Sequence, residues 1–86
     1  MYIIFSPKSW QEYIDNQSEK QLIKKTNELI KELMRGNNTK GTGKAELLKH
    51  NLSGYYSKRI TEAHRLIYSF ENGDLLIYKC RGHYEN

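Results

Sequence analysis

Residues 64–80 read HRLIYSFENGDLLIYKC, two β-rich runs on either side of a short polar turn. Asn-Gly is the strongest signal for a two-residue hairpin turn, because both central positions of that turn need a positive φ. The sequence therefore predicts strands at His64–Phe70 and Leu75–Arg81, joined at Asn72-Gly73.

This turn also predicts which residues face each other across the hairpin. Glu71 faces Asp74, and counting outward pairs Phe70 with Leu75, Tyr68 with Ile77 and Arg65 with Cys80. Strict alternation gives one apolar face and one mixed face. The apolar face holds Leu66, Tyr68, Phe70, Leu75 and Ile77, and the mixed face holds Arg65, Ile67, Ser69, Leu76, Tyr78 and Cys80. We expect helices to cover the apolar face and a ligand to bind on the mixed one.

Two further strands and one helix are predicted outward from the hairpin. Tyr56–Glu62 precedes it, and Tyr2–Phe5 opens the chain. Ser6 is placed to cap a helix that has Pro7 at its first position and ends near Gln17. The expected apolar stripe of this helix is Trp10, Tyr13 and Ile14.

A second, longer helix follows. Ser18 and Gln21 have the spacing of a capping box, and Gly36 is a plausible C-terminal cap. The apolar stripe between them consists of Leu22, Ile23, Thr26, Leu29, Ile30, Leu33 and Met34. The expected fold is α+β, with an N-terminal strand and two helices packed on one face of a C-terminal antiparallel sheet. The length predicts a single domain, residues 1–86.

The composition favours a polyanionic partner in a reducing compartment. Fourteen Lys and Arg against ten Asp and Glu give a net charge of +4, so RNA, DNA and acidic protein all fit. The single cysteine, Cys80, excludes an internal disulfide. With no signal peptide or membrane-spanning run, we expect a cytoplasmic protein that does not bind membranes.

Three familiar motifs are not supported. The basic loop Gly36–Lys44 has the glycine spacing of a phosphate-binding loop, but Thr42 replaces the required lysine. Cys80 and His83 have the spacing of a zinc-ligand pair, but no second pair exists, and no metal or other cofactor is expected. The lysine-rich face of the second helix is typical of solvated surface rather than of a DNA-reading helix.

Six residues together provide the groups for cutting RNA without a metal: Glu46, Lys49, Arg59, Arg65, His83 and Tyr84. The 2′-hydroxyl must lose a proton, the phosphate must be stabilised, and the leaving 5′-oxygen must gain a proton. A buried glutamate, cations and a protonated histidine supply these functions, and a tyrosine stacks on a base or binds phosphate. Any basic protein of this size contains such residues, and each is also explained as a solvated charge.

The stretch KAELLKHNLSGYYSKRITEAHRLIY (residues 44–68) resembles the signature of the YoeB toxins, within the RelE/ParE superfamily. CRGHY (residues 80–84) resembles that family's C-terminal end, and SPKSWQEY and NELIKELMR fit as well. The similarity implies a RelE-like, microbial ribonuclease-like fold. It implies the toxin of a type II toxin–antitoxin system that cuts mRNA on the ribosome and is silenced by a cognate YefM-like antitoxin. A homodimer is also expected.

The resemblance assigns a role to each candidate residue. Glu46 is the general base, His83 the general acid, and Arg65 stabilises the phosphate. Lys49 and Arg59 support Arg65, and Tyr84 contacts the RNA. The expected product ends in a 2′,3′-cyclic phosphate or a 3′-phosphate.

The sequence departs from the family pattern at two places. Ala63 stands where many relatives carry an acid, so a phosphate-network role of that acid is absent or passes to Glu62. Glu85 and Asn86 extend the chain beyond the usual end, close to His83. Strict alternation also puts His83 on the face opposite Arg65, and a bend or bulge at Gly82 would bring it back.

Two other functions remain open at this point. One is a non-catalytic ParE-like toxin that binds a protein target such as gyrase. The other is a plain module that binds RNA or an antitoxin. Glu46, Arg65 and His83 together favour the nuclease, because a binding module has no chemical need for all three.

Overall fold

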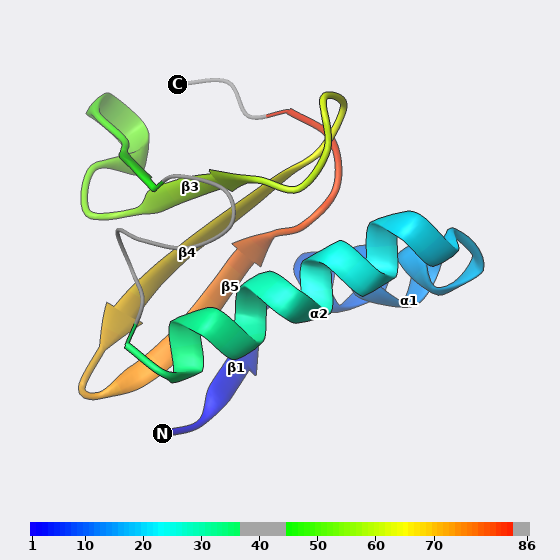
Figure 1. Cartoon of the computed structure of the whole chain (residues 1–86). Helices are drawn as coiled ribbons and strands as arrows, with labels where there is room; N and C mark the ends of the chain where they lie inside the picture. Colours follow the sequence, from blue (N-terminus) through cyan, green and yellow to red (C-terminus); the bar gives the residue numbers. More distant parts are fainter. Residues whose placement is uncertain (37–44, 84–86) are drawn as a thin grey trace.

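The computed structural model describes residues 1–36 and 45–83, which form a mixed sheet with two α-helices on one side (Figure 1). The strands lie in the order β1-β5-β4-β3-β2. The elements are β1 (Ile3–Phe5), α1 (Pro7–Asp15), α2 (Lys20–Met34), β2 (Glu46–Leu47), β3 (Tyr56–Arg59), β4 (Arg65–Glu71) and β5 (Asp74–Lys79), with short 3-10 helices η1 (Asn16–Ser18) and η2 (His50–Leu52). Most of the predicted basic loop and residues 84–86 lie outside the described residues.

The β4–β5 hairpin confirms the predicted turn. Asn72 and Gly73 have φ of +53° and +82°, the left-handed values that a type I′ turn requires. The pairs Glu71–Asp74, Phe70–Leu75 and Tyr68–Ile77 are all present. The register near the turn therefore follows from local chemistry alone.

Farther from the turn the predicted register is wrong. Ile67 pairs with Lys79, so β5 contains one extra residue at Tyr78, a β-bulge. The expected Arg65–Cys80 pair does not form. Cys80 belongs to the cluster under the helices, not to the opposite face as alternation predicted. Side chains along a strand alternate between the two faces of the sheet, so one extra residue moves every later side chain to the opposite face.

Non-local pairing completes the sheet on both edges. β1 pairs in parallel with β5, with Ile3 beside Leu75 and Phe5 beside Ile77. The two-residue strand β2, which was not predicted, pairs antiparallel with β3. β3 ends at Arg59 rather than at Glu62.

Helix α1 begins as predicted but buries a different face. The Ser6 side chain accepts a hydrogen bond from the Ser9 backbone N–H at 3.1 Å and caps the helix. Of the expected stripe, Tyr13 packs against the main core, whereas Trp10 and Ile14 are 50% and 44% exposed. The fully buried side chains are Ser9 on α1 and Asn16 at the start of η1. Each donates a hydrogen bond to a backbone carbonyl in or just after β5. Ser9 Oγ donates to Ile77 O at 2.7 Å, and Asn16 Nδ2 donates to Cys80 O at 2.9 Å.

Helix α2 confirms most of the predicted stripe but not the predicted cap. Its buried residues are Leu22, Thr26, Leu29, Ile30 and Leu33. Ile23 is half-buried, and Met34 at the end of the helix is 48% exposed, contrary to the prediction. The capping box is absent, because Glu19 occupies the N-cap position without a side-chain bond and Ser18 Oγ bonds Asp15 O instead. Gly36 follows the helix with φ of +85°, and its N–H bonds Leu33 O, as expected for a C-terminal cap.

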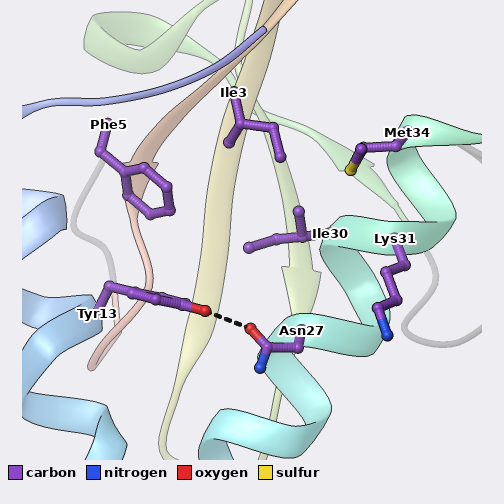
Figure 2. Close-up of a pocket in the computed structure, with 7 residues that line it drawn as sticks. All are labelled: Ile3, Phe5, Tyr13, Asn27, Ile30, Lys31 and Met34. Atoms are coloured by element: carbon purple, nitrogen blue, oxygen red, sulfur yellow. Dashed lines mark hydrogen bonds between the residues drawn. The ribbon is translucent and has the colours of Figure 1, made fainter. Parts of the chain in front are cut away.

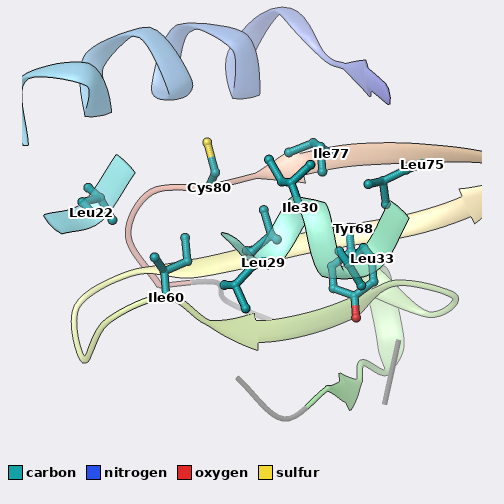
Figure 3. Close-up of a cluster of buried hydrophobic side chains, with 10 residues drawn as sticks. Leu22, Leu29, Ile30, Leu33, Ile60, Tyr68, Leu75, Ile77 and Cys80 are labelled. Carbon is teal, nitrogen blue, oxygen red and sulfur yellow. The ribbon is translucent and has the colours of Figure 1, made fainter. Parts of the chain in front are cut away.

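The main core lies between α2 and the sheet, with Leu29 and Leu33 opposite Tyr68, Leu75 and Ile77 (Figure 3). A second, smaller cluster of Leu48, Leu52 and Ile67 lies on the opposite side of the sheet, with Tyr55 against it. The mixed face is therefore partly covered by the segment around η2 rather than fully open. No helix within residues 1–36 and 45–83 is long and apolar enough to cross a membrane.

One charged residue is enclosed in the main core. Lys58 on β3 is fully buried, and its Nζ lies 3.9 Å from the Glu32 carboxylate on α2. Burial lowers the pKa of Lys58, and the charge of Glu32 opposes that shift. The sequence alone had suggested neither the burial nor the pair.

Candidate functional site

Three candidate residues share one face of the sheet. Glu46 is the partner of Ser57, which in turn faces Ile67, and Arg59 is the partner of Arg65. Cross-strand partners point to the same face, and residues two apart on a strand do so as well. Because Ile67 belongs to the small cluster away from the helices, Glu46, Arg59 and Arg65 lie on that face too. Arg65 therefore lies on the face to which the hairpin pattern assigned it, and Glu46 and Arg59 share that face.

The two arginines form an unusual pair. Residues directly opposite each other in an antiparallel sheet have Cβ atoms about 5 Å apart, and like charges there are destabilising. Arg59 is exposed and Arg65 half-buried, and neither takes part in an ion pair within the described residues. An anion between them would relieve the repulsion. The arrangement thus suits a phosphate.

Glu46 lies one diagonal step from Arg59, and Arg65 lies one strand farther away. A diagonal neighbour across an antiparallel pair is about 7–8 Å away, within reach of two long side chains. Glu46 is exposed, whereas the chemistry had led us to expect a buried glutamate. Its environment in the free protein is therefore set by water rather than by a hydrophobic pocket.

The segment after β2 brings a further cation to the same region. Leu48 and Leu52 are buried against the small cluster and anchor the segment. Lys49, at the N-cap of η2, and His50 are both exposed. His50 has φ of +57°, which indicates a tight local bend.

The C-terminal segment turns at Gly82, as expected. Gly82 has φ of +76°, and its carbonyl accepts a hydrogen bond from the Arg65 N–H at 3.0 Å. Its own N–H donates to His64 Nδ1 at 2.8 Å. His83 follows directly and is exposed, so the backbone of the proposed acid lies next to Arg65. Tyr84 lies outside the described residues.

Arg81 holds the start of this segment against the helices. Its guanidinium donates to Glu19 at 2.6 Å and to Asn16 Oδ1 at 2.7 Å. The bond to Glu19 is the main cause of a raised pKa for Arg81. Arg81 therefore has a structural contact on the helix side and is not one of the candidate cations of the site.

The turn between β3 and β4 carries Ala63, one of the two departures from the family pattern. Ala63 is exposed, and its N–H bonds Thr61 Oγ1 at 3.2 Å. Glu62, the other carboxylate considered for that role, is exposed in the same turn. His64, whose contact with Gly82 spans 18 positions, had no assigned role, and no local pattern reveals such a contact.

Among the hollows in the described residues is a groove of about 370 Å³ between β1, α1 and α2 (Figure 2). Ile3, Phe5, Ile30 and Met34 line it, and Tyr13 Oη donates to Asn27 Oδ1 at 2.6 Å along one wall. Lys31 is the only charged residue of its lining. The groove lies on the helix side of the sheet and lacks the acid–base set, so it is not the candidate catalytic site. No cluster of three or more potential metal ligands occurs in the described part of the chain.

Comparison with known proteins decides the family. Residues 5–84 match the model for the YoeB-like toxin of the bacterial type II toxin–antitoxin system. The chain belongs to the YoeB family. It is therefore a toxin of a type II toxin–antitoxin system, and the match spans the candidate residues from Glu46 to Tyr84.

Relatives and solved structures agree with this assignment. The chain is 49% identical to Toxin YoeB of Escherichia coli K12 over 98% of this chain and 100% of the relative. It is 48% identical to Toxin YoeB of Synechocystis over 99% of each chain. The toxin in the YoeB–YefM complex from Staphylococcus aureus is 42% identical, with a TM-score of 0.88 over 98% of both chains. These matches give no support to the ParE-like alternative.

Proposed function

We propose that this YoeB-family toxin is a ribosome-dependent endoribonuclease that cuts mRNA by general acid–base chemistry, without a metal ion. The observation that carries the proposal is the shared face of Glu46, Arg59 and Arg65. A carboxylate diagonal to Arg59, in a cross-strand arginine pair that forms no ion pair within residues 1–36 and 45–83, provides a proton acceptor next to a phosphate site.

The reaction needs two proton transfers. The Glu46 carboxylate takes the proton of the ribose 2′-hydroxyl, and the 2′-oxygen attacks the adjacent phosphorus. The bond from phosphorus to the 5′-oxygen breaks, and His83 protonates that oxygen as it leaves. The products are a 2′,3′-cyclic phosphate, which water can open to a 3′-phosphate, and a free 5′-hydroxyl. Arg65 offsets the charge on the phosphate, and Lys49 and Arg59 add to the positive potential. Tyr84 contacts the RNA.

The open site supports a requirement for the ribosome. Glu46, Lys49, Arg59 and His83 are all exposed, so water screens their interactions with a bound phosphate. Electrostatic stabilisation of a transition state is far stronger where water is excluded. A large partner that covers this face and holds the mRNA in place would supply both conditions.

Partners follow from the relatives. The Staphylococcus aureus toxin was solved as a YoeB–YefM complex and as a YoeB dimer. We infer that this chain likewise binds a cognate YefM-like antitoxin and forms a homodimer. The protein carries +4 net charge, which favours an acidic antitoxin as well as RNA.

Separate substitutions of Glu46 and His83 test the mechanism. Glu46→Ala and His83→Ala should each lower the rate of mRNA cleavage on translating ribosomes by about 10²- to 10⁴-fold, because each group acts in the transition state. Binding to the ribosome should stay nearly unchanged. The measurement is a time course of new mRNA 3′-ends, with Lys8→Ala on the exposed side of α1 as the control variant.

An mRNA with sulfur in place of the leaving 5′-oxygen separates the two roles. A thiolate leaves without protonation, so His83→Ala should lose most of its defect on this mRNA, whereas Glu46→Ala should keep its own. Equal defects on the sulfur substrate would exclude His83 as the acid. Unchanged cleavage by both variants on normal mRNA would exclude the nuclease site altogether.

A further inference from the structure

We propose that His64 is a positioning residue of the nuclease site, which holds the segment carrying His83 through the Gly82 N–H. The inference rests on the proposed function, because it assigns a role only if His83 acts on the RNA. Its basis is the contact of 2.8 Å between His64 Nδ1 and the Gly82 nitrogen.

Two consecutive residues, His64 and Arg65, form hydrogen bonds with both backbone polar groups of Gly82, its N–H and its carbonyl. His64 accepts from the Gly82 N–H, and the N–H of Arg65 donates to the Gly82 carbonyl at 3.0 Å. β5 ends at Lys79, three residues earlier, so the ladder no longer fixes the chain at this point. The imidazole therefore serves as the acceptor that a neighbouring strand would otherwise provide.

His64 is itself firmly placed. Its carbonyl accepts from the N–H groups of Ile60 and Thr61, and its own N–H donates to Thr61 O. The ring is half-buried and precedes β4 directly. Three backbone hydrogen bonds fix the position of the turn, and therefore of the imidazole that bonds Gly82.

The bond constrains the protonation of the ring. Nδ1 can accept a hydrogen bond only when it carries no proton, so the proton of the neutral ring sits on Nε2. His64 is thus fixed as an acceptor toward Gly82 and is not available at Nδ1 as a proton donor to RNA. This distinguishes its role from that of His83.

Loss of the hydrogen bond between Gly82 and His64 should displace His83, because His83 directly follows Gly82. A general acid works only within hydrogen-bond reach of the atom it protonates, and a misplacement of about 1 Å costs on the order of 100-fold in rate. His64→Ala should therefore lower the cleavage rate by about 10- to 100-fold on ribosomes programmed with normal mRNA. His64→Asn should restore most of the rate, because the amide oxygen can occupy the place of Nδ1 and accept the same N–H.

Thr61→Val provides a matched control in the same turn. It removes the hydroxyl that accepts the Ala63 N–H at 3.2 Å but leaves the His64–Gly82 bond in place. Cleavage by this variant should stay close to wild type. A loss as large as that of His64→Ala would attribute the effect to a loosened turn and overturn the proposal.

The sulfur-substituted mRNA links His64 to His83. If His64 acts through the acid, the defect of His64→Ala should largely disappear on that substrate, and the double variant with His83→Ala should be no slower than His83→Ala alone. A His64→Ala defect that persists while that of His83→Ala disappears would overturn the positioning role. A His83→Ala defect that persists would instead refute the acid assignment in the proposed function.

The hydrogen bond itself can be observed without any assay of activity. A scalar coupling between the Gly82 and His64 Nδ1 nitrogens in ¹⁵N-labelled wild-type protein is expected, because an N–H···N hydrogen bond transmits such couplings. Absence of the coupling in the folded protein would show that the contact is not formed and would overturn the proposal, even where His64→Ala proves too unstable to purify.

Discussion

Cys80, the single cysteine of the sequence, is enclosed between α1 and β5. Its Sγ lies 3.6 Å from Ser9 O, and its N–H donates to the Glu12 carboxylate at 2.8 Å. Burial raises the pKa of the Cys80 thiol to about 12, with the Glu12 charge adding to the shift. The thiolate, which is the reactive form, is therefore suppressed in the folded state.

We expect this thiol to be inert toward disulfide reagents at pH 8. Its reaction with a colorimetric aromatic disulfide should be limited by unfolding of the protein and become fast in urea. Lys8→Cys, which adds a thiol at an exposed position of α1, should give one fast and one slow equivalent. Rapid reaction of native wild-type protein would contradict the enclosed position of Cys80.

The two predicted helix caps, at Ser6 and Ser18, offer a direct comparison. Ser6 accepts the Ser9 N–H and caps α1, whereas Ser18 only donates to Asp15 O at 3.3 Å on the surface. Ser6→Ala should lower the free energy of unfolding by about 1 kcal/mol, the usual effect of losing an N-cap. Ser18→Ala should change it by less than about 0.5 kcal/mol. Urea denaturation measures both changes. Equal changes in the free energy of unfolding would mean that the N-cap hydrogen bond of Ser6 does not stabilise the protein.

Local signals in the sequence were enough to predict the hairpin turn, the α2 stripe and the C-terminal cap at Gly36. Each depends on a few neighbouring residues that share one conformation. In the α1 stripe, Tyr13 packs on the core as predicted, but Trp10 and Ile14 were mispredicted because hydrophobicity alone chose them. Ser9 and Asn16 are buried instead because their polar groups donate hydrogen bonds to the backbone carbonyls of Ile77 and Cys80. Only the tertiary structure brings these carbonyls within reach.

For the candidate site, the sequence indicates which residues to propose but only part of their geometry. The shared face of Arg59 and Arg65 follows from strand pairing, and a bend at Gly82 follows from its lack of a side chain. The bulge at Tyr78, the short strand β2 and the contact of His64 with Gly82 depend on residues distant in sequence. A pattern of residue types along one chain carries no information on those distances.

For the whole molecule, the buried Lys58 links stability to pH. Because burial lowers the pKa of Lys58 below 10.5 in the folded state, the unfolded chain binds more protons just below pH 10.5. From this group alone, stability therefore rises as pH increases through that window. The Glu32 charge counteracts the shift and so stabilises the charged lysine.

Glu32→Gln should therefore destabilise the protein at pH 7 by on the order of 2 kcal/mol, since it leaves Lys58 with less compensation for its burial. The difference from wild type should shrink as the pH approaches 10, where the lysine sheds its charge. Glu28→Gln, an exposed position on the same helix, is the matched control and should be nearly neutral. Urea denaturation at several pH values tests this, and a difference that does not vary with pH would contradict a charged Lys58–Glu32 contact.

The lengths of the two outer strands affect the tendency of the protein to aggregate at high concentration. β1 has three residues and β2 has two, and in the described part of the chain these are the edges of the sheet. An unpaired edge is a template for strands of other molecules, and short edges are one way in which proteins avoid growing into fibrils. Even with Ile4 exposed on β1, each edge offers too little backbone for a cross-β stack to begin. Within the described residues, the shortness of both edge strands thus limits fibril growth by a basic, tyrosine-rich chain.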